Sequence, residues 1–398
     1  MSENIYVPFF KPSIGIEEKK AVESVMDSGW LTTGKITLAF EQEFASFTGA
    51  RFALAVNSNT NGMLLAMEAC GIKPGCSVIT TPYSFVSTAA CALHLGADVI
   101  FADIEKDSYS IDCDKIEEIL KRDCAERKIR AIVPVHVGGN LCDMKRIRAL
   151  AKEYSTPENK IFVIEDAAHS FPSKTGAGTY AGTFGDAGVF SFYATKTITT
   201  GEGGMITVND ENLARRMRVT RLHGMDRTTW DRYTNEKASW EYDIIACGFK
   251  CNLPDVLSAI GREQLKKAQS FYEKRRKIAE KYNEAFRECD FLELPPDSEG
   301  NAWHLYLLKI VPELLDCSKE TFAREMQSEG IGISVHFIPL FHFTFWKNLY
   351  SDFSSEHFPN AESQYQKTIS IPLWPDMSEQ MIEKVISVVK KLGQNHHV

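Results

Sequence analysis

The 398-residue sequence lacks features that would point to several other classes of protein. There is no basic surplus, since 45 Lys and Arg stand against 53 Asp and Glu, a formal net charge of -8. Such a chain has few cations to neutralise nucleic-acid phosphates, so we expect no general nucleic-acid binding. The ten cysteines include no CxxC pair, and their scatter predicts buried thiols in a reducing cytoplasm, without a metal site.

Long apolar runs are also missing. The first 13 residues have no basic stretch followed by an apolar one, so we expect no secretory signal. The longest apolar segments, such as 85–95, are interrupted by Ser, Thr and His and are shorter than a membrane span. With 44% hydrophobic and 25% charged residues, the composition is typical of a globular protein, and we expect a cytoplasmic location without membrane partners.

Short β-branched runs alternate with helical patterns through most of the chain. Nearly unbroken apolar strands that alternate with helices indicate a mostly parallel sheet with helices on both faces. The expected strands are 52–56, 78–81, 99–102, 131–135, 161–164, 189–192 and 205–208, and the expected helices are 16–28, 38–48, 60–70, 84–95, 114–121 and 144–154.

The C-terminal part has a different pattern. A long helix is expected from Pro254 to about Phe286, with Pro254 in its first turn. We therefore expect the α/β class, with a large sheet domain over residues 1–267 and a smaller α+β domain over 268–398. The elements expected in the smaller domain are strands 305–311 and 333–337 and helices 318–328 and 378–392.

Polar side chains gather where several of the expected strands end. Ligands of parallel sheets bind at the carboxyl ends of the strands, so we expect these side chains to face one site. They are Asp166 and His169 after strand 161–164, Ser191 and Lys196 in and after strand 189–192, and Ser58, Thr60 and Asn61 after strand 52–56.

These residue types match what pyridoxal phosphate needs from a protein. A lysine must form an imine, and partial burial lowers its pKa so that neutral amine is available. A carboxylate must face the pyridine nitrogen, because a protonated ring withdraws electrons from the reacting carbon. Hydroxyls and a helix N-terminus must hold the phosphate, and a flat side chain must stack on the ring. The candidates are Lys196 for the imine, Asp166 for the nitrogen, Ser58, Thr60, Asn61 and Ser191 for the phosphate, and Phe85 or His169 for stacking.

Each candidate also has a purely structural explanation. Lys196 fits a solvated loop lysine, while Asp166 and Thr60 fit helix N-caps. Phe85 fits an apolar helix face, and His169 fits a hydrogen-bonded interior histidine. The functional interpretation rests on the coincidence of these signals at the strand ends of one expected sheet.

Together the motifs resemble the DegT/DnrJ/EryC1/StrS family of sugar aminotransferases, which belong to the fold-type I, aspartate-aminotransferase-like pyridoxal-phosphate enzymes. The block Phe190–Lys196 is the most specific, and the resemblance covers nearly the whole chain. The other matching segments are 28–34, 81–88, 134–138, 165–169, 184–186, 201–204, 221–224, 252–255, 303–306 and 336–339.

The resemblance implies catalytic roles. Lys196 would be the imine lysine and proton shuttle, and Asp166 would pair with the ring nitrogen. His169 would lie against the ring and its 3-hydroxyl. A related branch of the family carries His at the lysine position and performs dehydration, so Lys196 favours amino transfer.

The resemblance also implies how the phosphate is held. Thr60, Asn61 and Ser191 match phosphate-binding positions, and Phe85 matches the stacking position. Asn252 matches a residue that reaches the phosphate of the neighbouring subunit, which implies a homodimer with shared active sites.

One departure from the family lies in the phosphate turn, where Asn59 stands at a position that is commonly Gly. Asn adopts a positive φ more readily than most residues, so we expect the turn to persist.

Enzymes of this kind take an amino group from L-glutamate and deliver it to a nucleotide-linked keto sugar, here expected to be a 4-keto-6-deoxy hexose. Another fold-type I activity, such as an aldolase or lyase, and a regulatory homologue without chemistry remain as alternatives. The histidines on the sugar side also fit satisfied positions in the small domain, and the arginines fit surface ion pairs. The sugar-side candidates are Trp30, Thr32, Arg227, His336 and His342, with Arg221 as a further partner for a diphosphate or carboxylate.

Overall fold

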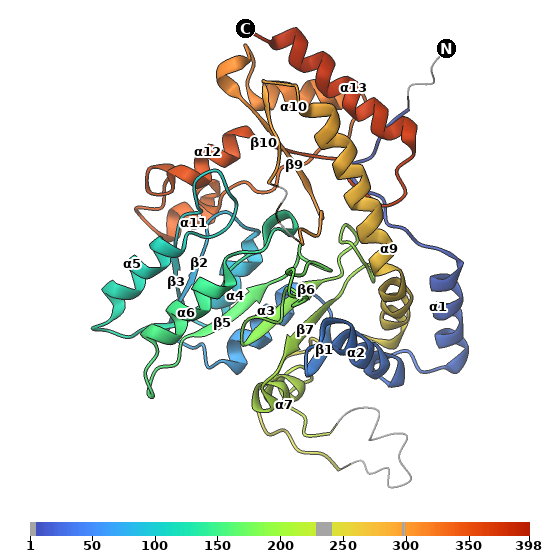
Figure 1. Ribbon diagram of the computed structural model, residues 1–398. Helices are drawn as coiled ribbons and strands as arrows, with labels where there is room; N and C mark the ends of the chain where they lie inside the picture. The colour runs from blue at the N-terminus through green and yellow to red at the C-terminus, as the bar shows by residue number, and fades with distance from the viewer. Residues whose placement is uncertain (1–4, 228–240, 297, 299) are drawn as a thin grey trace.

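The computed structural model describes residues 5–227, 241–296, 298 and 300–398. A seven-stranded sheet forms the centre of the larger part (Figure 1). Its strands are β1 (Phe52–Val56), β2 (Ser77–Thr80), β3 (Asp98–Phe101), β4 (Ile129–Ile132), β5 (Phe162–Asp166), β6 (Ala187–Ser191) and β7 (Gly204–Val208). Their order is β1-β7-β6-β5-β4-β2-β3, and β7 alone in this sheet runs antiparallel to both neighbours. The mostly parallel sheet is therefore confirmed.

Helices cover both faces of this sheet, as expected. They are α1 (Ile16–Ser28), α2 (Lys35–Thr48), α3 (Asn59–Ala69), α4 (Val86–His94), α5 (Cys113–Asp123), α6 (Met144–Tyr154), α7 (Glu211–Thr220) and α9 (Asp255–Phe286). Because side chains alternate along a strand, Leu54 packs with α3, α4 and α7 on one face, whereas Ala55 packs with α2 and α9 on the other. Helices α5 and α6 cover that second face beneath β2, β4 and β5.

The C-terminal part holds a small antiparallel sheet of order β10-β9-β8. In Figure 1 this sheet lies above the large one, with α10 and α13 beside it and α9 running between the two parts. Its elements are β8 (Leu292–Glu293), β9 (Tyr306–Ile310), α10 (Lys319–Ser328), α11 (Thr344–Leu349), α12 (Pro359–Lys367), β10 (Thr368–Ile371) and α13 (Glu379–His396). The 3-10 helices of the described residues are η1 (Val137–Gly139), η2 (Pro312–Leu314), η3 (Leu340–His342) and η4 (Ser355–His357).

The expected strand at 333–337 is wrong. Only Ser334 pairs, through an isolated bridge to Ser370, because the residues after it turn into the wall of a cavity. The strand that completes the small sheet is β10, which the sequence pattern did not reveal. Helix α7 was also missed, and Pro254 is the N-cap of α9 and not a residue of its first turn.

Helix α9 runs across the expected domain boundary at 267/268. Its first half, with Leu265, packs beneath the large sheet, and its second half, with Tyr282, packs in the C-terminal core. Val7, from the N-terminal segment, also belongs to that C-terminal core. The boundary between the domains therefore stays a prediction. Within the described ranges, no helix is long and apolar enough to cross a bilayer.

Candidate active site

A cavity of about 520 Å³ opens at the carboxyl ends of β1, β5 and β6. The strand ends bring together side chains that are far apart in the sequence, as the sheet topology predicts. The predicted residues that line it are Ser58, Thr60, Phe85, Asp166, His169, Ser191, Lys196 and His336.

Asp166 is the last residue of β5 and is only 4% exposed. One carboxylate oxygen accepts the Thr88 hydroxyl at 2.7 Å, and the other accepts the Ala168 N–H at 3.2 Å and the Asn59 amide at 3.4 Å. Every one of these partners donates, so together they fix the direction of the carboxylate. Thr88 lies on α4, remote from Asp166 in the chain, and although it belongs to the matching segment 81–88 it was not among the predicted site residues.

Lys196 lies in the turn after β6, in the same cavity as Asp166. Burial lowers the pKa of its ammonium group to about 8, and the negative charge of Asp166 opposes part of that effect. A lysine with this pKa supplies neutral amine near physiological pH, which is the form that attacks a carbonyl. Lys196 is half-buried on the cavity wall, so it is not a fully solvated loop lysine, and its role as the imine lysine stays a prediction.

His169 lies on the cavity wall between two aromatic groups. Its ring stacks on Phe337 with centroids 5.3 Å apart, and the His304 ring is 4.5 Å away. Burial lowers the pKa of His169 well below its usual value, and the charges of Lys196 and His336 add to the effect. The Gly138 N–H donates to Nδ1 at 3.3 Å, so Nε2 carries the proton of the neutral ring.

The N-terminus of α3 opens into the cavity beside Ser58 and Thr60. Ser58 caps this helix by accepting the Asn61 N–H at 3.1 Å, so Thr60 is not the N-cap. Helix N-termini carry partial positive charge and exposed N–H groups, which suits a phosphate. A Cβ at Gly204 would lie 2.9 Å from the Asn59 nitrogen, so glycine allows β7 to pass close to the start of the helix.

Asn59 does not need the positive φ that its position in the phosphate turn suggested. It is the first residue of α3 and is not among the residues with positive φ. Its side chain instead donates to the Val189 carbonyl at 2.9 Å and to Asp166. Asn59 therefore ties the start of the helix to β6 and to the buried carboxylate, a role that glycine cannot fill.

Phe85 is 60% exposed at the cavity, although it precedes an apolar helix. An aromatic face at this position is free to stack on a flat ligand. Ser191 ends β6, and its hydroxyl accepts the Tyr193 N–H at 3.3 Å. His336 faces the cavity, where burial lowers its pKa to about 3, and its Nδ1 lies 2.9 Å from the Ser370 hydroxyl.

Several other predicted residues do not line this cavity. The Asn61 side chain donates to Asn57 at 2.7 Å, and His342 pairs with Glu362 at 2.6 Å. The Trp30 indole donates to the Thr33 carbonyl at 3.3 Å, in the segment that precedes α2. Thr32 lies in that same segment, where its carbonyl accepts the Asp255 N–H. Within one chain, these four side chains therefore do not reach the main cavity.

Arg227 and Asn252 line a second hollow of about 250 Å³, beside Arg215 and Arg218 on α7. Arg215 and Arg218 are exposed, and the sequence interpretation missed them because it missed the helix that carries them. Arg221 reaches the same hollow, but it is buried and pairs with Glu41, so its surface ion-pair interpretation is wrong. The second hollow is therefore cationic, with Asp226 as an opposing charge.

The main cavity fits pyridoxal phosphate by the chemistry of its donors. Lys196 offers an amine, Asp166 offers a carboxylate held by donors, and the start of α3 offers an anion site. Among the described residues that line it, Lys196 is the only Lys or Arg. The donors that this chain offers to a cofactor phosphate there are therefore hydroxyls and backbone N–H groups.

The sequence profile of the DegT/DnrJ/EryC1/StrS aminotransferase family matches residues 12–390. Spore coat polysaccharide biosynthesis protein SpsC of Bacillus subtilis is 40% identical over 392 residues, which are 98% of this chain and 97% of SpsC. The structure is similar to the putative sugar aminotransferase Spr1654 of Streptococcus pneumoniae in its PMP form, with a TM-score of 0.89 and 26% identity over 98% and 99% of the two chains. It is also similar to Helicobacter pylori PseC, an aminotransferase of pseudoaminic acid biosynthesis, with a TM-score of 0.88 and 28% identity over 98% and 100%. The chain therefore belongs to the DegT/DnrJ/EryC1/StrS aminotransferase family.

Proposed function

We propose that this enzyme transfers the amino group of L-glutamate to a nucleotide-linked keto sugar, with a 4-keto-6-deoxy hexose as the expected acceptor. The general activity follows from the family: the chain is a pyridoxal-phosphate-dependent aminotransferase that acts on sugars. The donor and the acceptor are the parts that we propose. The observation that carries the site assignment is that Lys196 and Asp166 line one cavity. A chain in which they faced different cavities could not hold the two ends of one cofactor ring.

When bound, pyridoxal phosphate supplies the electron sink for the reacting carbon. Lys196 would hold the cofactor through its amine and, once free, would act as the base that moves a proton at the substrate carbon. The Asp166 carboxylate, whose direction its donors fix, would face the ring nitrogen. His169, neutral and protonated at Nε2, is suited to donate to the oxygen of the ring hydroxyl.

A homodimer is part of the proposal. Exposed apolar side chains surround the second hollow: Leu38 lines it, and Ile244 and Ile245 lie next to Met225, which also lines it. A second copy of the chain would cover these side chains and bring Asn252 to the partner's cofactor phosphate. Sedimentation of the purified protein at micromolar concentration tests this, and a monomer would contradict the shared-site arrangement.

The decisive experiment separates amino transfer from the alternative activities. The lysine-bound form is mixed with glutamate, and 2-oxoglutarate is measured against enzyme sites. One equivalent of 2-oxoglutarate supports amino transfer, whereas its absence would favour an aldolase or lyase. A purified protein that stays colourless with added cofactor would favour the regulatory homologue.

The acceptor is identified in the second half of the same cycle. The amine form of the cofactor is incubated with a panel of nucleotide-linked keto sugars that differ in nucleotide and in keto position. The sugar that restores the original visible absorbance fastest is the acceptor. If no member of the panel restores it while 2-oxoglutarate does, the sugar assignment is wrong.

A further inference from the structure

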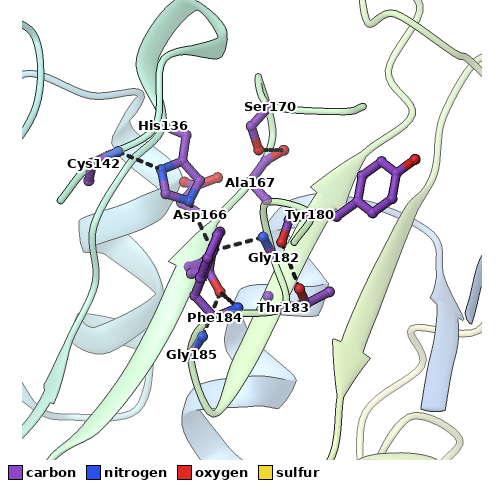
Figure 2. A network of polar contacts seen from close by, with 12 residues as sticks. His136, Cys142, Asp166, Ala167, Ser170, Tyr180, Gly182, Thr183, Phe184 and Gly185 are labelled. Carbon is purple, nitrogen blue, oxygen red and sulfur yellow. Dashed lines mark hydrogen bonds and ion pairs between the residues drawn. The ribbon is translucent and has the colours of Figure 1, made fainter. Parts of the chain in front are cut away.

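Glu165 and Asp166 are neighbours at the end of β5 and face opposite sides of the sheet, as alternation along a strand requires. Asp166 lines the cavity, whereas Glu165 is fully buried away from it. Glu165 contacts both His136 and the 182–185 turn. Figure 2 labels His136, Gly182 and Gly185 of this network. Burial of a carboxylate costs folding free energy unless hydrogen-bond donors surround the group. The donors around Glu165 therefore decide whether the structure can hold it there.

The Glu165 carboxylate has a complete set of donors. Oε1 accepts the N–H groups of Phe184 and Gly185, both at 2.7 Å. Oε2 accepts the Gly182 N–H at 2.8 Å and lies 3.0 Å from Nε2 of His136. The Cys142 N–H donates to Nδ1 of His136 at 3.2 Å, so Nε2 carries the proton that His136 donates to Glu165.

The turn held by Glu165 leads directly into β6. A Cβ at Gly185 would overlap the Val163 carbonyl, and one at Gly188 would overlap the backbone of Gly182. At these two positions the chain therefore packs backbone against backbone, with no side chain between. Since β6 leads on to Lys196, the position of this turn sets where the lysine side chain starts.

His136 extends the same network towards His169. Its backbone N–H donates to the Asp166 carbonyl at 3.2 Å, so it holds the residue that faces the ring nitrogen. The η1 turn follows His136, and its Gly138 N–H is the group that donates to His169. One buried carboxylate is thus joined through hydrogen bonds to the segments that carry Asp166, Lys196 and His169.

We propose that Glu165, together with His136, is the positioning group that fixes Asp166, Lys196 and His169 relative to one another around the cofactor. The inference rests on the cofactor roles proposed above for these three residues. Glu165 does not line the cavity, so it acts through them and touches neither cofactor nor substrate. Its loss should therefore change cofactor binding and the chemical step, and leave sugar binding nearly unchanged.

The variant Glu165→Gln tests this with little change in volume. An amide oxygen can accept from one pair of donors, but its NH₂ group then faces the other pair, so half of the network is lost. The matched control is Glu18→Gln: Glu18 is also buried in the large domain, where it pairs with Lys267 at 2.7 Å and accepts the Gly15 N–H at 2.7 Å and the Gln264 amide at 2.8 Å. Glu18 does not line the cavity, and its partners do not either.

Four quantities are compared in the two variants: the cofactor Kd of stripped protein, the pH dependence of the visible absorbance, kcat with KM for each substrate, and Tm. In Glu165→Gln we expect the cofactor Kd to rise and kcat to fall, each by roughly 10- to 100-fold, because a misplacement of about 1 Å has that effect on chemistry. KM for the sugar should change less than about threefold. Glu18→Gln should lower Tm and leave the cofactor Kd, the absorbance and kcat at their original values.

The measurements distinguish a positioning role of Glu165 from a purely structural one. If Glu165→Gln lowers Tm as Glu18→Gln does and keeps the original cofactor Kd, absorbance and kcat, Glu165 is only structural and the inference is wrong. If it fails to fold, His136→Gln replaces it; this variant keeps the three backbone donors of Glu165 and should shift kcat and cofactor Kd in the same direction by a smaller factor. Unchanged values in that variant would equally overturn the inference. An Asp166→Asn variant with unchanged kcat would instead contradict the proposed function, whatever Glu165→Gln does.

Discussion

The main cavity and the second hollow differ in how much of the required chemistry one chain supplies. The main cavity is built from strand ends and a helix start, and it already holds an amine, a hydrogen-bonded carboxylate and an anion site. The second hollow has exposed arginines of α7, with Arg227 and Asn252, but none of the reactive groups. A nucleotide-linked substrate carries several negative charges, and the described lining of the main cavity offers only Lys196 as a cation.

The difference supports the proposal that the cofactor and the negative charges of the substrate are held by different parts of the fold. Strand ends of a rigid sheet hold reacting groups within tenths of an ångström, whereas an exposed helix face can meet a ligand only when something covers it. In the proposed dimer, the second hollow of one subunit completes the main cavity of the other. Variants in the main cavity and in the second hollow should therefore have separable effects, and those in the main cavity should be the larger.

Replacement of Lys196 by Ala should have the largest effect. Loss of the covalent anchor and proton carrier is expected to lower kcat by at least roughly 10⁴-fold and to remove the visible absorbance of the lysine-bound cofactor. The measurement is single-turnover formation of 2-oxoglutarate, with the absorbance spectrum recorded beside it. If this variant keeps its activity, the reaction does not take place at Lys196 in the main cavity.

Asp166→Asn should reduce kcat by roughly 100-fold, because a neutral amide no longer holds the proton on the ring nitrogen. Asn keeps the size of the side chain, so the cofactor should still bind through Lys196 and remain coloured. Steady-state kinetics with both substrates gives kcat and KM. A fall confined to KM would mean that Asp166 binds substrate and does not act on the ring.

The pH dependence of cofactor capture follows from the lowered pKa of Lys196. Only the neutral amine attacks the cofactor aldehyde, so the capture rate of stripped protein should rise roughly tenfold per pH unit at lower pH and level off above about 8. Stopped-flow absorbance between pH 6 and pH 10 measures this. A rate that climbs until about pH 10 would show an amine that burial does not perturb.

Arg218→Ala should affect only the second hollow. Loss of one exposed cation is expected to raise KM for the nucleotide sugar roughly fivefold, about 1 kcal/mol, and more at low salt than at high salt. The glutamate half-reaction should not change. Arg122→Ala on α5, an exposed helical arginine that does not line either hollow, is the control. If Arg218→Ala and Arg122→Ala change KM for the nucleotide sugar equally, the second hollow does not bind the substrate.

Mixed dimers join the two regions in one experiment. Co-expressed Lys196→Ala and Asn252→Ala subunits should regain roughly a quarter of the original activity, because half of the dimers are hybrids and each hybrid has one intact site. Each variant alone should be far less active. Mixtures no more active than the sum of the separate variants would mean that each site is complete within one chain.

Much of the fold could be predicted from the sequence because strong local patterns carry it. The strand at 52–56 and the helix at 144–154 were expected with the bounds that the structure has, since apolar periodicity and capping residues define them. Helix α7 was missed because its charged sequence hides a short buried stripe. The expected strand at 333–337 failed because Ser334, His336 and Phe337 line a cavity instead of pairing in a sheet.

The candidate site was predictable where chemistry and strand ends coincide. Lys196, Asp166 and His169 follow strands of one sheet, so their meeting could be expected from topology. Thr88 and the Glu165–His136 pair could not be found in this way, because hydrogen bonds between residues far apart in the chain leave no periodic signal. The position of Asn252, in the second hollow and not in the main cavity of its own chain, could not be predicted from the residues around it in the sequence either.

By itself, the sequence determined which residues are able to react and in which order the strands and helices come, because residue chemistry and periodicity are local properties. Only the tertiary structure decided which of those residues share a cavity, how far the pKa of Lys196 falls, and that a second cationic hollow lies apart from the first. Burial, hydrogen-bond partners and the spacing of charges depend on every element that packs around a group, and no single segment contains that information.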